Sequence, residues 1–239
     1  MILGIIVALP EELSSLTNAK IKKGQIHSLA DNISVIRSGT GSENASHAAQ
    51  ELITHGVDHL ISWGCAGALS KQLKPGHLII PTQLVDHQNA LINLHTSWPE
   101  YLCRTLTAPK TISSGKLLES KQLVSHWRNK EHLHKTTHAD LVDMESVAIA
   151  RIAQLNDIPF VAIRAIADSA TMNLPKAISH SLDDQGEVQL NNLLKYLATH
   201  PNEILELIKL GLSFHFAKKS LCHVADQLDI ITAFHSPDN

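Results

Sequence analysis

Three acidic residues that could act as general acids or bases each lie beside an apolar stretch of the chain. Glu12 lies two residues after Pro10, Glu145 lies in the run VDMES at 142–146, and Asp168 directly follows the apolar stretch 160–167. A carboxyl group beside a bond that breaks with charge separation can donate or accept a proton. Each residue also has a structural interpretation, because acidic side chains favour the N-cap and first turn of a helix.

Two glycine-bearing segments follow predicted strands, SGTGS at 38–42 and GCAGA at 64–68. We expect both to be turns, in which glycine lets backbone amides approach a ligand at the carboxyl edge of a sheet. A dinucleotide fold is the obvious alternative. The first segment reads G-T-G-S-E-N, however, and lacks the third glycine of that fingerprint.

Four patches in order resemble the superfamily of nucleoside phosphorylases and methylthioadenosine nucleosidases. They are GIIVALPEE at 4–12, SGTG at 38–41, SWGCAGAL at 62–69, and VDMES at 142–146 leading to RAIADSA at 164–170. The match spans residues 1 to about 172. Within the superfamily the chain is most similar to the hopanoid-associated phosphorylases, on VDMES, on ADSA followed by Leu174 and Pro175, and on the Leu-rich tail after Pro201.

The resemblance implies a role for each candidate residue. Asp168 matches the general acid that protonates purine N7, which requires a pKa above the usual value of about 3.9. Glu145 matches the residue that binds the ribose hydroxyls, with Met144 against the sugar, and Glu12 matches the residue that activates water. The rest of the expected substrate pocket consists of Cys65, Ala66, Gly67 and Leu118.

The nucleophile is left open between water and phosphate. Phosphate, as a co-substrate, could bind at Gly39, Thr40, Gly41 and Arg37. Some phosphorylases carry an arginine where this chain has Ser62, and a hydroxyl residue where it has Cys65. These departures, with Glu12 present, favour water. A Cys65 nucleophile is a further alternative, but spacing alone defines no Cys-His-Asn set.

Apolar runs of strand length alternate with helical patterns. The expected strands are 2–8, 33–37, 59–63, 77–81 and 160–167, and the expected helices include 43–54 and 145–155. Runs without alternation are typical of strands covered on both faces. We therefore predict an α/β fold, a three-layer αβα sandwich with a largely parallel, mixed central sheet. The chain reads as one domain, 1–239, with a C-terminal helical tail at 187–228.

Composition excludes several classes of protein. A net charge of -3 with mixed signs does not suit nucleic-acid binding. Three scattered cysteines favour no disulfide framework, and the apolar start is unlike a signal peptide, so we expect a cytoplasmic protein. The cluster His132, His134 and His138 completes no metal-ligand spacing and contains Lys130 and Lys135; we interpret it as a solvated polar stretch and expect neither metal nor cofactor.

The tail predicts helices at 187–198 and 204–228, broken at Pro201. A core-facing stripe is expected on the second helix at Ile204, Leu207, Ile208, Phe214, Leu221, Ala225 and Leu228. A smaller strip, Leu205, Leu212 and Phe216, lies opposite, flanked by Lys209 and Lys219. It is consistent with a subunit contact in a homodimer or higher oligomer, or with further packing within the chain. Peripheral membrane contact is the other alternative, and it would make the protein membrane-associated.

These observations predict an enzyme, an N-glycosyl hydrolase or a pentosyltransferase, that releases adenine from a 5′-modified adenosine. By resemblance the favoured substrate is adenosylhopane, in hopanoid biosynthesis. The alternatives are a methylthioadenosine or adenosylhomocysteine nucleosidase and a purine nucleoside phosphorylase. A non-catalytic nucleoside-binding protein is a further alternative, from which loss of Asp168 or Glu145 would be expected.

Overall fold

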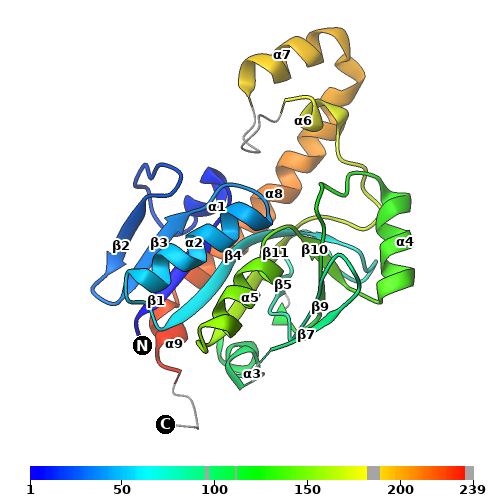
Figure 1. Cartoon of the computed structure of the whole chain (residues 1–239). Coiled ribbons are helices and arrows are strands. Elements are labelled where there is room, and N and C mark those ends of the chain that lie inside the picture. Colours follow the sequence, from blue (N-terminus) through cyan, green and yellow to red (C-terminus); the bar gives the residue numbers. More distant parts are fainter. Residues whose placement is uncertain (95–96, 111, 182–188, 235–239) are drawn as a thin grey trace.

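The computed structural model describes residues 1–94, 97–110, 112–181 and 189–234. Its sheet is built around the long strand β4 (His59–Ala68), which pairs in parallel with β1 (Leu3–Val7) on one side and β11 (Phe160–Asp168) on the other. All three strands are almost wholly buried, as their unalternating apolar sequences predict. Their carboxyl ends therefore meet at one edge of the sheet, where Figure 1 also places the start of α2.

The remaining strands extend this sheet on both sides. Its order is β2-β3-β1-β4-β10-β9-β6-β7, and β11 joins β4 to β5, which pairs with β8. Parallel pairing predominates, with antiparallel contacts at β2–β3, β4–β10, β5–β11 and β6–β7. The strands not yet bounded are β2 (Ile26–Ala30), β3 (Ile33–Arg37), β5 (Leu78–Ile79), β6 (Gln83–Val85), β7 (Leu91–Asn93), β8 (Ile112–Ser113), β9 (Lys116–Glu119) and β10 (Leu141–Asp143).

Helices cover both faces of the sheet and complete the predicted three layers. Two of them, α2 (Ser42–Thr54) and α5 (Ser146–Leu155), pack side by side on one face, and α3 (Ser97–Thr105), α8 (Ile204–Ala225) and α9 (Leu228–Thr232) bury their apolar sides on the other (Figure 1). A third apolar cluster lies under α4 (Trp127–Thr137). The shorter helices are α1 (Pro10–Leu13), α6 (Lys176–Ser179), α7 (Leu190–Thr199) and the 3-10 turn η1 (Pro201–Glu203). The predicted fold class is thus confirmed.

The second glycine segment is not the turn that its sequence suggested. Residues 64–66 continue β4 and pair with residues 164–166 of β11, and residues 67–68 pair with β10. Small side chains permit this because the strand is crowded by charged groups from its neighbours. A Cβ on Gly67, for example, would lie 3.3 Å from a carboxylate oxygen of Asp168.

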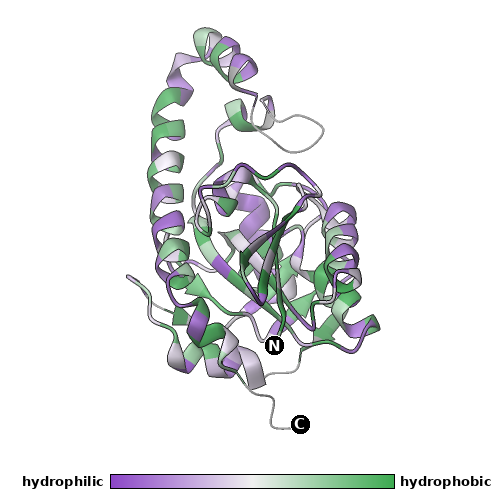
Figure 2. Cartoon of the chain, turned by 90° about the vertical axis from the view of Figure 1, so that its left-hand side faces the viewer, coloured by the Kyte–Doolittle hydropathy of each residue, from purple (hydrophilic) through white to green (hydrophobic). Residues whose placement is uncertain are grey.

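The tail departs from the prediction in two ways. The predicted helix 204–228 ends at Ala225 and a separate helix, α9, follows; the predicted start of the preceding helix at 187 lies outside the described residues. Ile204 and Ile208, expected in the core, are 42% and 54% exposed. They are exposed because α6, α7, η1 and residues 204–212 of α8 form an arm that stands clear of the sheet (Figures 1 and 2). Only the later half of α8 reaches the core.

The strip on α8 is exposed in the structure, although the Lys110 ammonium lies over the Phe216 ring, 4.5 Å from its centroid. Leu205, Leu212 and Phe216 are 67%, 57% and 45% exposed. Ile204 and Ile208 extend it along the arm, and Figure 2 shows hydrophobic residues over this length of the helix. Among the described residues, no helix has both the length and the apolar character needed to cross a bilayer.

Candidate active site

Glu12 is held in place by three backbone amides. It lies on α1, one turn after β1, and is 4% exposed. Its Oε2 accepts hydrogen bonds from the amides of Ala8 and Leu9 at 3.1 and 3.0 Å, and its Oε1 accepts one from Cys65 N on β4 at 2.7 Å. Burial raises the pKa of Glu12, while the Arg164 guanidinium and the three amides act against this. A carboxylate fixed in this way is suited to accept a proton.

Arg164 lies in the middle of β11, is 2% exposed, and organises a buried polar network that we call the Arg164 cluster. Its Nε contacts Asp143 Oδ2 at 2.8 Å, and its Nη2 donates to the hydroxyls of Ser62 and Ser146. Asp143 accepts a further hydrogen bond from Ser146 Oγ at 2.5 Å. Because a buried guanidinium needs partners for all its donors, this arginine defines where the neighbouring polar side chains lie.

Gly64 is the point at which Glu12 and Arg164 meet. A Cβ added there would lie 2.6 Å from Arg164 Nη1 and closer still to Glu12 Oε1. No side chain larger than hydrogen fits between the two groups. A base and a cation therefore converge on one spot above β4, where they could bind and orient a small polar nucleophile.

Glu145 joins the same cluster from the start of α5. Its Oε1 accepts a hydrogen bond from Gly41 N at 2.8 Å, across the turn between β3 and α2. Burial and the negative charge of Asp143 raise its pKa to about 7, against the opposing effect of Arg164. The residue thus begins a helix, as the structural interpretation held, yet its side chain points to the glycine turn rather than capping its own helix.

Asp168 closes β11 and is buried, with 8% exposure. Its Oδ2 accepts a hydrogen bond from Lys130 Nζ of α4, and we call these two residues the Lys130–Asp168 pair. Burial raises the pKa of Asp168, and the Lys130 charge and hydrogen bond partly offset that rise. The alternative that Asp168 caps a helix is wrong, because a loop follows it and α6 begins only at Lys176.

Cys65 lies between the Arg164 cluster and the Lys130–Asp168 pair. Burial raises the pKa of its thiol well above the ordinary value, and the charges of Glu12 and Asp168 add to this effect while Arg164 opposes it. A thiol of raised pKa is a poor nucleophile at neutral pH, which favours a pocket-lining role for Cys65 over a nucleophilic one. The same interactions indicate that Glu12, Arg164 and Asp168 surround one short stretch of β4.

The other predicted pocket residues lie at different distances from this centre. Ala66 and Gly67 are on β4 beside Asp168, and the half-buried Met144 directly precedes Glu145. Leu118 lies instead in the apolar cluster under α4, beside a cavity of about 490 Å³. A second cavity, of about 530 Å³, separates α4 from residues 69–72 and 170–171. Neither cavity is lined by Asp168 or Glu145.

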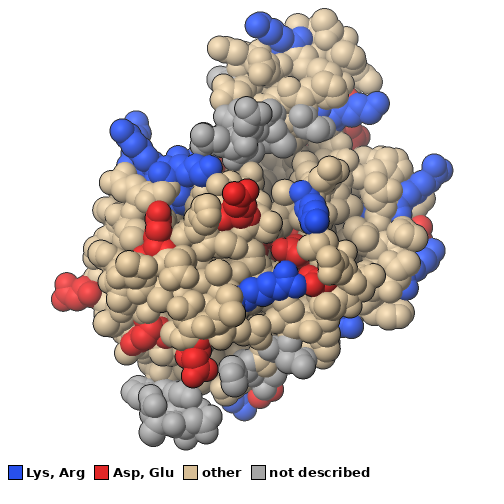
Figure 3. Space-filling model, in the orientation of Figure 1, with Lys and Arg blue, Asp and Glu red and all other residues tan. Residues whose placement is uncertain are grey.

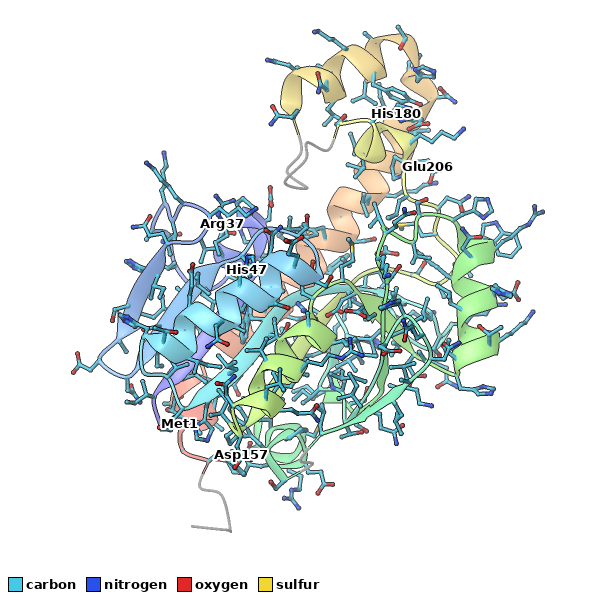
Figure 4. The ribbon with its side chains drawn as sticks, viewed as in Figure 1. Met1, Arg37, His47, Asp157, His180 and Glu206 are labelled. Atoms are coloured by element: carbon cyan, nitrogen blue, oxygen red, sulfur yellow. The ribbon has the colours of Figure 1, made fainter. Side chains whose placement is uncertain are left out.

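The candidate phosphate turn, residues 39–41, lies beside the carboxylate of Glu145 and the side chain of Lys23. Gly41 N is already bonded to the Glu145 carboxylate, and the Lys23 side chain passes Gly39. Arg37 Nε donates to Ile21 O at 3.1 Å, and Figure 4 shows Arg37 at the end of β3 nearest the arm. Thr40 accepts a hydrogen bond at its carbonyl from Asn44. A carboxylate therefore takes the amide that a phosphate would be expected to use.

Arg164 and Lys130 were not among the residues predicted for the site. Arg164 could have been identified from the sequence, because a charged residue inside an otherwise apolar strand must be paired when that strand is buried. Lys130 could not: it belongs to a stretch interpreted as solvated, yet its side chain is wholly buried. In the described part of the chain no three His, Cys, Asp or Glu side chains are arranged to hold a metal ion.

Comparison with known proteins gives consistent results. The family model described as Phosphorylase superfamily matches residues 2–198. A 5′-methylthioadenosine/S-adenosylhomocysteine nucleosidase of Buchnera aphidicola (Baizongia pistaciae) is 30% identical over 72% of this chain and 79% of its own length. An aminodeoxyfutalosine nucleosidase of Helicobacter pylori is 26% identical over 64% and 72%. The fold matches that of the 5′-methylthioadenosine/S-adenosylhomocysteine nucleosidase from Helicobacter pylori, with a TM-score of 0.69 at 21% identity over 96% and 97% of the two chains.

Proposed function

Because this chain belongs to the Phosphorylase superfamily, we propose that it cleaves the N-glycosidic bond of a 5′-modified adenosine, with water as the nucleophile. The observation that carries the proposal is the convergence of Glu12 and Arg164 at Gly64, at the same sheet edge as Glu145 and Asp168. The two nucleosidases among the relatives support the reaction class. The chain is accordingly an N-glycosyl hydrolase, with the pentosyltransferase reaction as the alternative.

The proposed reaction assigns one proton transfer to each end of the nucleoside. Glu12 accepts a proton from water as the water oxygen bonds to ribose C1′. Asp168 gives a proton to purine N7 as the C1′–N9 bond breaks, and adenine leaves as the neutral base. Glu145 accepts hydrogen bonds from the ribose hydroxyls and favours the positive charge that develops on the sugar. Exchange of protons with solvent then restores Glu12 and Asp168.

The charges of the Arg164 cluster favour water over phosphate. Three carboxylates, Glu12, Asp143 and Glu145, surround one guanidinium, and Glu145 occupies the Gly41 amide. A phosphate dianion there would add to an excess of negative charge in a buried site, which is costly. Lys23 and Arg37 border the glycine turn and are the cations that a phosphate would have to use.

An assay of adenine release decides between the two nucleophiles. Methylthioadenosine and adenosylhomocysteine are supplied with and without phosphate, and the sugar product is identified by mass spectrometry. We expect release without phosphate and a free 5-substituted ribose. A requirement for phosphate, with a sugar 1-phosphate as product, would contradict hydrolysis. Release from none of the 5′-modified adenosines by the wild-type protein would contradict the proposed function itself.

We further propose that the substrate is adenosylhopane and that the protein binds it at an anionic membrane surface. The exposed strip on the arm supports this, because apolar residues rimmed by lysine suit the interface of an anionic bilayer. Residues 189–225 carry four lysines against two glutamates, whereas the whole chain has a net charge of -3. Figure 3 shows the lysine side chains of the arm in blue, with no arginine in this part of the chain.

Vesicle flotation tests the membrane proposal. Vesicles of phosphatidylcholine with and without phosphatidylglycerol are mixed with the wild type and with the double variant Leu205→Asp/Leu212→Asp. We expect the wild type to float only with the anionic vesicles and the variant to stay in solution. Leu155→Asp, at an 80% exposed position on α5, is the matched control. A strip covered by a second copy of the chain would instead give a dimer in sedimentation that the double variant breaks, and no flotation.

A further inference from the structure

Lys130 is a lysine with no exposed surface in a helix that is otherwise largely polar. Burying an ammonium group costs several kcal/mol unless its donors are satisfied. Lys130 Nζ has three acceptors: Asp168 Oδ2, Ser169 O at 3.0 Å and Met172 O at 3.1 Å. All three lie on β11 or on the loop that follows it. The lysine is therefore built into the surroundings of one carboxylate.

Two further hydrogen bonds join the same two segments independently of the lysine. Trp127 N, at the start of α4, donates to Asn173 Oδ1 at 3.0 Å, and Leu174 N donates to Ser125 O at 2.8 Å. The loop after Asp168 is thus attached to α4 without Lys130. Because these bonds already hold the loop, anchoring it does not by itself account for a buried charge.

The two oxygens of Asp168 have different surroundings. Oδ2 accepts a hydrogen bond from Lys130, whereas Oδ1 has no hydrogen-bond partner within the described residues. Both oxygens lie beside Gly67, whose added Cβ would be 3.3 Å from Oδ1 and 3.4 Å from Oδ2. Glycine leaves open the space on that side of the carboxyl group. For a ligand atom approaching over β4, Oδ2 is already bonded to Lys130, and Oδ1 is the oxygen left to interact with it.

We propose that Lys130 is a positioning residue. It holds Asp168 Oδ2 in a hydrogen bond, so that Oδ1 faces the departing purine. The inference rests on the proposed function, in which Asp168 protonates N7. As the proton leaves Oδ1, negative charge forms on the carboxyl group, and the adjacent ammonium stabilises it. Lys130 keeps its own proton throughout, so the step breaks the Oδ1–H bond and forms the N7–H bond.

Two opposing effects act on the pKa of Asp168 at this position. Burial raises the pKa of Asp168, which keeps it protonated, and Lys130 lowers it, which makes the proton easier to transfer. A proton donor works best when its pKa is near the working pH. Lys130 from α4 is the charged group that acts on Asp168, and the neutral thiol of Cys65 lies near it on β4; Glu12 and Glu145 act mainly within the Arg164 cluster.

The test compares pH profiles of adenine release. Lys130→Met keeps the apolar length of the side chain and removes the charge. We expect kcat to fall roughly tenfold to a hundredfold, as misplacement of a reacting group does. We also expect the alkaline limb of kcat/KM to move up by about one to three pH units, because Asp168 loses the cation that favours its ionised form. Lys130→Arg should keep the limb near the wild-type position.

A double-mutant comparison separates this role from a structural one. Adding Lys130→Met to Asp168→Asn should lower the rate little further, because Lys130 acts through Asp168. Lys135→Met, on the exposed side of α4 and paired with Glu131, is the matched control and should leave the profile unchanged. An unmoved alkaline limb, or additive losses in the double variant, would overturn the inference. Thermal unfolding of each variant identifies any that are misfolded.

The proposed function and this inference fail in different ways. A wild-type protein without activity would contradict the proposed function. The interaction is then read from the protein alone, by following the Asp168 carboxyl carbon during an NMR pH titration in the wild type and in Lys130→Met. We expect its midpoint to be higher in the variant, and an equal midpoint would overturn the inference.

Discussion

The Arg164 cluster and the Lys130–Asp168 pair lie at the same edge of the sheet but differ in their charges. The cluster holds three carboxylates around one guanidinium, whereas the pair holds one carboxylate and one ammonium. Burial and the negative charge of Asp143 raise the pKa of Glu145 to about 7, while in the pair the lysine opposes the effect of burial on Asp168. The first arrangement favours a cation nearby. The second holds a carboxyl group that burial keeps protonated and whose ionised form the lysine stabilises.

This difference matches the charges of the proposed transition state. Positive charge develops on the ribose, next to the electron-rich cluster, and negative charge develops on the purine, next to the acid supported by a lysine. Each site is suited to one end of the breaking bond. The comparison can therefore be tested by changing the charge of each region separately.

Removing the cation of the Arg164 cluster should have the largest effect. In Arg164→Met, Glu12, Asp143 and Glu145 lose their shared counter-ion in a buried site. Breaking a buried ion pair by removing one partner costs about 3–5 kcal/mol of stability. Urea unfolding measures this loss, and base release should fall with it. Arg104→Met, at an exposed position on α3, is the control, and equal stabilities of the two variants would contradict the role of the cluster.

Removing the acid should stop the reaction while the fold is kept. Asp168→Asn retains the shape of the side chain and an acceptor for Lys130, but it has no acidic proton. Adenine release should fall on the order of a hundred- to ten-thousandfold. Adenine binding, measured by calorimetry, should remain.

The control for this variant is Asp157→Asn, beyond the end of α5 (Figure 4). Its positive φ of 55° suits asparagine, so the exchange should be neutral. An Asp168→Asn enzyme with the activity of the control would remove Asp168 from the mechanism.

The sequence predicted the fold better than it predicted the partners in the site. Apolar runs marked β1, β3 and β11 because these strands are buried on both faces. The segment 64–68 was misjudged because glycine and alanine resemble a turn, while pairing with β10 and β11 decides its conformation. On the arm, Ile204 and Ile208 had the spacing of core residues, but periodicity does not say whether anything covers a helix.

The candidate site shows the same limit. Glu12, Glu145 and Asp168 were found from motifs, and the structure places all three at one sheet edge. Lys130 was not predicted, because its partner is 38 residues away in sequence and its neighbours are polar. A contact between a helix and a distant strand end leaves no local pattern, whereas Arg164 could have been identified from the apolar strand around it.

The smallest predicted effect is a change in the pH dependence of stability, and it tests the charge excess directly. The folded-state pKa of Glu145 is raised from an ordinary 4.5 to about 7. Its contribution to stability is therefore fully present below pH 4.5 and is lost as the pH rises through about 7. Glu145→Gln removes this titration and leaves those of Glu12 and Asp168 in place. Between pH 5 and pH 8 the wild type should lose about 2–3 kcal/mol more stability than the variant.

Urea unfolding at the two pH values gives the comparison, with Glu51→Gln on the exposed side of α2 as the control. Equal losses in the wild type and Glu145→Gln would mean that the guanidinium of Arg164 neutralises the cluster, and the contrast between the two regions would not hold.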